Sequence, residues 1–112
     1  MSRASRRAKA EGELEHLEAR FRERLIVALH ACREGRSGLF GQTRTIPADV
    51  AALLALGDEI DELRSSLGFP DGNALLARLK ADRRLRAESA PGEPRLAQQF
   101  LDELESGALG ST

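Results

Sequence analysis

The segment that decides the fold is residues 13–34, ELEHLEARFRERLIVALHACRE. Its apolar residues recur at spacings of three and four, which is the repeat of one face of an α-helix. They are Leu14, Leu17, Phe21, Leu25, Ala28 or Leu29, and Cys32. Gly35 follows the segment, and a glycine there can end a helix in the left-handed conformation. The pattern predicts an amphipathic helix about 30 Å long.

Three further helices are predicted downstream from start and stop signals of the same kind. They cover about residues 47–67, 73–88 and 94–106. Pro47 is the predicted first residue of the second helix and Pro94 that of the fourth, and either Asp71 or Asn73 is the predicted N-cap of the third. Gly68 and Gly107 can end the second and the fourth helix. The glycine-rich residues 35–46 between the first two helices are expected to form a loop.

The composition supports the same fold class. The chain of 112 residues has 18 Leu and 17 Ala against 3 Ile and 2 Val, with no Tyr or Trp. Leucine and alanine favour helices, whereas β-branched and aromatic residues, which favour strands, are scarce. We therefore expect an all-α protein, a small helical bundle of about four helices built on a long antiparallel hairpin of the first two.

The length is that of one domain, with segments at each end that lack an apolar pattern. Residues 1–12 are predicted to form a basic flexible arm, residues 13–106 a single helical domain, and residues 107–112 a loose tail. The apolar stripes of the first two helices span about five turns each, more than two short helices can cover, which predicts a homodimer.

Several protein classes are excluded at this stage. No run of about 18 apolar residues is present to span a membrane, and the basic start leads into charged residues rather than an apolar signal segment. A single cysteine, Cys32, cannot form an intramolecular disulfide, which favours a reducing compartment. We therefore expect a cytoplasmic protein without a membrane segment.

Residues suited to catalysis or metal binding are sparse. His16 and His30 are 14 positions apart on one predicted helix, too far to share a metal ion. The acidic residues of the first two helices are expected to be solvated, and Cys32 fits a small core residue better than a nucleophile. We expect no catalytic residue, cofactor or metal, and predict a non-catalytic protein–protein interaction or regulatory module.

The loop of residues 35–46 supplies one candidate site. An ordered loop that carries Arg36, Phe40 and Arg44 can contact a partner protein, with Leu39 pointing inward and Phe40 outward. The competing interpretation is structural, because Leu39 and Phe40 can instead both fold back to cap the helical core.

The alternative function is association with nucleic acid. Two groups of basic residues can neutralise phosphates, one in the N-terminal arm and one in the predicted third helix. They are Arg3, Arg6 and Arg7, and Arg78, Lys80, Arg83, Arg84 and Arg86. The competing interpretation is that the bases of the third helix face the acidic residues of the second, since the net charge of the chain is only −1.

Overall fold

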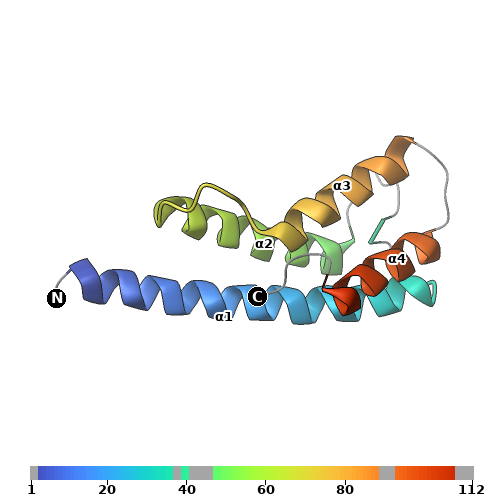
Figure 1. Cartoon of the computed structure of the whole chain (residues 1–112). Coiled ribbons are helices and arrows are strands. Elements are labelled where there is room, and N and C mark those ends of the chain that lie inside the picture. Colours follow the sequence, from blue (N-terminus) through green and yellow to red (C-terminus); the bar gives the residue numbers. More distant parts are fainter. Residues whose placement is uncertain (1–2, 37–38, 41–46, 89–92, 108–112) are drawn as a thin grey trace.

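In a computed structural model of the protein, four helices make up the part of the chain that it describes (Figure 1). The structure describes residues 3–36, 39–40, 47–88 and 93–107, and for residues 3–4, 84–88 and 93 it describes the backbone alone. Within these ranges the helices, with no strand, are α1 (Arg3–Arg33), α2 (Ala48–Ser66), α3 (Ala74–Glu88) and α4 (Glu93–Ser106). The predicted all-α class is confirmed. In this part of the chain, each helix is too short or too polar to cross a bilayer.

The long helix α1 organises the others. Both α2 and α4 contact α1 and run antiparallel to it, and α3 lies on the side of these two helices away from α1 (Figure 1). At a rise of 1.5 Å per residue, α1 with 31 residues is about 46 Å long and α2 with 19 residues about 28 Å. The expected antiparallel hairpin of the first two helices is confirmed, and the start of α1 extends beyond it.

The glycines predicted to end helices do so by a local hydrogen-bond pattern. Gly35 has φ 77° and Gly68 has φ 83°, values that an L-residue rarely adopts. The N–H of Gly68 donates to the carbonyl of Ser65 at 3.0 Å, and the N–H of Phe69 donates to that of Arg64 at 3.0 Å. This is a Schellman motif, and the residues around Gly35 form the same one.

The first helix begins ten residues earlier than the sequence pattern predicted. We expected it to start at about Glu13, after a flexible arm, whereas α1 begins at Arg3. Residues 3–12 have few large apolar side chains, but alanine, arginine, lysine and glutamate favour helix, and extending an existing helix costs little. Arg7 also pairs with Glu11 one turn later, with 2.9 Å between Nε and Oε1.

One continuous apolar core joins all four helices. Along the α1–α2 hairpin, Leu63 is partly buried, and the buried side chains include Phe21, Leu25, Leu29, Leu53 and Ile60. From α4, Ala97, Phe100, Leu101 and Leu104 are buried in the same core.

This packing does not support the reason for predicting a homodimer, which was that the apolar stripes of α1 and α2 exceed what the remaining helices can cover. The stripe residues are buried or partly buried within one chain, because α4 packs along α1 and the side chains of Leu39 and Phe40 join the core. Among the described residues, the large hydrophobic side chains left exposed are Val27 and Phe69.

Candidate interaction surface

The predicted loop site is not assembled as a surface. Phe40 was expected to point outward, but its side chain is 1% exposed and lies in the core beside the equally buried Leu39. Arg36 is exposed and pairs with Glu34, with 2.8 Å between Nε and Oε2, and its hydrogen bond and charge lower the pKa of the Glu34 carboxyl. Arg44 lies outside the described residues. The structural interpretation of Leu39 and Phe40 is therefore the correct one.

A basic residue of α3 holds the two loop residues in place. The guanidinium of Arg83 donates a hydrogen bond from Nη1 to the backbone carbonyl of Leu39. Arg83 is partly buried, and this burial lowers the pKa of its guanidinium. A side chain predicted to contact phosphate thus satisfies a backbone acceptor inside the protein.

A second base of α3, Arg78, ties α3 to α4. Its Nε lies 3.0 and 3.1 Å from the two carboxylate oxygens of Asp82, and its Nη1 contacts Oε2 of Glu103 on α4. Its guanidinium carbon is 5.5 Å from the ring centre of Phe100, a cation–π distance. Burial alone lowers the pKa of Arg78, but the hydrogen bonds that it donates to the two carboxylates, together with their charges, outweigh it and the net shift is upward.

Asp82 in this cluster is 4% exposed. Burial raises the pKa of its carboxyl and the charge of Glu103 adds to this effect, whereas the hydrogen bond and charge of Arg78 oppose it. Because two carboxylates share one guanidinium, the cluster has an excess of negative charge inside the α3–α4 contact.

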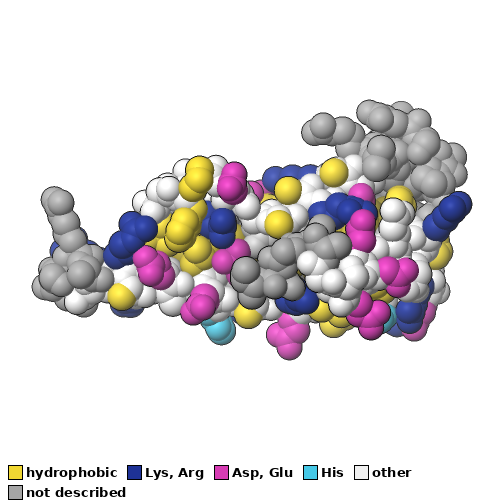
Figure 2. Space-filling model, in the orientation of Figure 1, with side chains coloured by type: hydrophobic (Ala, Val, Ile, Leu, Met, Phe, Trp, Pro, Cys, Tyr) yellow, Lys and Arg dark blue, Asp and Glu magenta, His cyan; other side chains and the backbone are white. Residues whose placement is uncertain are grey.

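The remaining predicted nucleic-acid contacts are dispersed. Lys80 faces Asp58 of α2, with 3.3 Å between Nζ and Oδ1, as the competing interpretation of the third helix expected. The side chains of Arg3, Arg84 and Arg86 lie outside the described part of the structure. Arg6 and Arg7 are exposed on α1, at the opposite end of the molecule from the C-terminal half of α3 (Figure 1). Figure 2 shows basic and acidic side chains interspersed over the face that it displays.

Asn73 links three elements through hydrogen bonds. Its Oδ1 accepts the N–H of Leu76 at 3.0 Å, which caps α3 and decides between the two N-caps considered from the sequence. Its Nδ2 donates to Oε2 of Glu18 on α1 at 2.7 Å, and its backbone N–H donates to Oδ1 of Asp61 on α2 at 2.9 Å. Glu18 and Asp61 therefore hold the α2–α3 connection instead of being fully solvated.

The described side chains offer no metal centre, because no three of His, Cys, Asp or Glu among them are grouped so that they could bind one ion. His16 and His30 are exposed, and Cys32 is buried. The charged and polar contacts of α2, α3 and α4 given above join helices to one another, which is a structural role.

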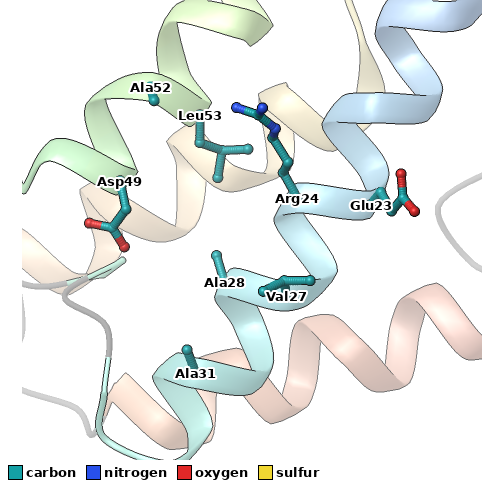
Figure 3. Close-up of a pocket in the computed structure, with 8 residues that line it drawn as sticks. All are labelled: Glu23, Arg24, Val27, Ala28, Ala31, Asp49, Ala52 and Leu53. Atoms are coloured by element: carbon teal, nitrogen blue, oxygen red, sulfur yellow. The ribbon is translucent and has the colours of Figure 1, made fainter.

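Among the described residues, one feature suited to recognition is a hollow of about 470 Å³ between α1 and the beginning of α2, which we name the α1–α2 groove (Figure 3). Its lining residues are Glu23, Arg24, Val27, Ala28, Ala31, Asp49, Ala52 and Leu53. The groove exists because small alanine side chains from both helices meet at this position, where larger residues would fill the space. Its lining is apolar except at the rim, where charged side chains stand.

Two charged side chains of the rim, Arg24 and Asp49, have opposite signs and lie at opposite ends of the groove, while Glu23 points away from α2 (Figure 3). Because α1 and α2 are antiparallel, Arg24 lies at the end nearer the start of α1, and Asp49, from the first turn of α2, lies at the end nearer Ala31 (Figure 3). Val27 is 67% exposed and stands beside the hollow, so an apolar side chain protrudes next to an apolar depression.

The groove was not predicted from the sequence. Its signal is that Val27 falls off the stripe of residues spaced three and four apart, and is an apolar residue with no assigned place in the core. That signal says where an apolar side chain is exposed. It does not show which neighbouring helix leaves room beside it, and this depends on how α2 packs against α1.

Comparison with protein-family models, with curated proteins and with solved structures found no match to this chain. The function is therefore inferred from the geometry of the groove.

Proposed function

We propose that this protein is a non-catalytic helical module that binds a partner protein in the α1–α2 groove. The observation that carries the proposal is Val27, which is 67% exposed at the edge of an apolar hollow of about 470 Å³. Exposed apolar side chains beside a depression are typical of surfaces that are covered by another protein. A helix presenting one apolar side chain can lie along a groove between two helices and insert that side chain into it.

The non-catalytic part of the proposal is supported by the chemistry of the groove. Its lining consists of alanine, valine and leucine side chains, and the charged side chains Glu23, Arg24 and Asp49 stand at its rim. A catalytic site needs a nucleophile, base or metal directed at a common reacting atom, and these lining residues do not supply such a set. We propose the cytoplasm as its location, because the single cysteine fits a reducing compartment.

The alternative function, nucleic-acid association, has weaker support. Arg78 and Arg83 are engaged by Asp82, Glu103 and the carbonyl of Leu39, so these cations would have to give up internal contacts to bind phosphate. Binding to a DNA or RNA oligonucleotide measured at several salt concentrations tests it. A steep fall in affinity with salt would favour this alternative over the protein-binding module.

Site-specific photo-crosslinking in cells tests the proposed function. A photoreactive amino acid replaces Val27 in the groove, and in two control proteins it replaces the exposed Glu62 of α2 or Glu105 of α4. We expect a discrete crosslinked product from position 27 that is weak or missing in both controls. A position-27 protein that forms no product, or the same products as the controls, would refute the proposal.

A further inference from the structure

The α1–α2 groove contains both halves of a contact side by side. Val27 protrudes with 67% of its surface exposed, and Ala28, Ala31 and Ala52 leave a depression next to it. A two-fold interface uses the same patch on both subunits, so the patch must carry both a projection and a recess that accepts it. The groove meets this requirement of shape.

The charges of the rim meet the corresponding electrostatic requirement. A two-fold axis through the groove places α1 antiparallel to the α1 helix of the other chain, so that each end of the groove faces the opposite end of its copy. Arg24 at one end then faces Asp49 of the second copy at the other, and the same pair forms twice. A rim of one sign would repel its copy, whereas this arrangement attracts it.

The third charged residue of the rim, Glu23, points to the side of α1 away from α2 (Figure 3). Glu23 therefore takes no part in the Arg24–Asp49 pairs across the groove.

From these observations we propose that the occupant of the α1–α2 groove is a second copy of this chain, bound as an antiparallel two-fold dimer through Val27 and paired Arg24 and Asp49. The proposal rests on the proposed function and names its partner. It is centred on Val27, which lies outside the apolar stripes that predicted a dimer from the sequence; the residues of those stripes are buried or partly buried inside one chain.

Charge reversal followed by mixing tests the proposal. The variants are Arg24→Glu, Asp49→Arg and Val27→Asp, with Arg95→Glu and Glu105→Arg as matched reversals at exposed positions of α4. Their masses are measured by sedimentation equilibrium from micromolar to near millimolar concentration, and their helix content by far-ultraviolet circular dichroism. The decisive sample is an equimolar mixture of the Arg24→Glu and Asp49→Arg chains.

The expected masses follow from the pairs. Wild type and both α4 controls should move with concentration from 12.2 kDa towards twice that value. Each groove variant alone should stay at 12.2 kDa, because Arg24→Glu sets the introduced glutamate against Asp49 twice, and Asp49→Arg sets two arginines together twice. The mixture should dimerise again, since a mixed dimer pairs the introduced glutamate with the introduced arginine in one contact and Arg24 with Asp49 in the other.

Recovery on mixing cannot come from a contact within one chain, because each chain keeps its own mutation. A wild type that stays at 12.2 kDa throughout, or a mixture of folded variants that stays monomeric, would overturn the dimer. In that case a crosslinked product from position 27 with a different protein would leave the proposed function standing and assign the groove to that protein. Failure of both experiments would remove both proposals.

Discussion

Gly57 in the middle of α2 provides the sharpest test of the packing. A Cβ added at this position would lie 2.6 Å from Cδ1, 2.9 Å from Cδ2 and 3.2 Å from Cγ of Leu76 on α3. The first two distances are shorter than carbon atoms tolerate, and Leu76 is 1% exposed, so its side chain has little room to move. Overpacking of this kind costs about 1–3 kcal/mol.

The same substitution has an opposing local effect. Replacing glycine by alanine inside a helix stabilises it by about 1 kcal/mol. Gly12 of α1 supplies the matched control, because a Cβ there would meet nothing within 4 Å. We therefore expect Gly12→Ala to raise the free energy of unfolding by about 1 kcal/mol. Gly57→Ala should lower it by as much as about 2 kcal/mol, which is the overpacking cost less the helical gain.

Denaturant unfolding followed by circular dichroism measures both values, and a double-mutant cycle identifies the cause. Leu76→Ala alone should cost about 2–5 kcal/mol by creating a cavity. In the Leu76→Ala protein the opposing atoms are gone, so adding Gly57→Ala should stabilise by about 1 kcal/mol, a reversal of sign. If Gly57→Ala stabilises the wild type as much as Gly12→Ala does, α3 does not approach α2 as closely as described.

Three other outcomes follow from the burial and contacts of individual side chains. Phe40→Ala should lower the free energy of unfolding by about 3–5 kcal/mol, an effect comparable to that of Leu39→Ala. A free energy of unfolding that is unchanged in Phe40→Ala would show that this side chain is exposed and not part of the core. Asn73→Ala should lower the free energy of unfolding by about 1–3 kcal/mol, because Glu18 loses a hydrogen-bond donor and α3 loses its N-cap. An unchanged denaturation midpoint would contradict this. For Asp82, burial raises the pKa in the folded state above its ordinary value of 3.8, so its contribution is greatest below pH 3.8 and is lost as the pH rises through the folded pKa. The unfolding free energy of wild type minus that of Asp82→Asn should therefore fall as the pH rises over that range. A rise in this difference would show the sign to be wrong.

The contacts of the candidate site residues could not be predicted from the sequence. Phe40 was assigned to the surface because loops often carry contact residues, yet Arg83, 43 positions later, fixes the adjacent carbonyl and the ring enters the core. The partner of Arg78 on α4, Glu103, is 25 positions away, and no local pattern relates the two. In each case the decisive contact joins residues from different helices or from a helix and a loop. Composition and spacing do not contain that information.

Local chemistry in the sequence determined the helices and most of their ends. Leucine and alanine favour helix, and Gly35 and Gly68 end α1 and α2 because glycine alone adopts positive φ at low cost. The stripe in residues 13–34 also identified most of the buried face of α1, because helical periodicity places these side chains together wherever the helix lies.

Only the tertiary structure decided which parts of the remaining faces are covered. Gly57 of α2 leaves the space that Leu76 of α3 occupies, and Val27 and its neighbouring alanines line a groove because α2 leaves that side of α1 open. The physical reason is that burial is a property of pairs of surfaces. The sequence specifies each surface separately, whereas their fit depends on the crossing and separation of helices that lie far apart along the chain.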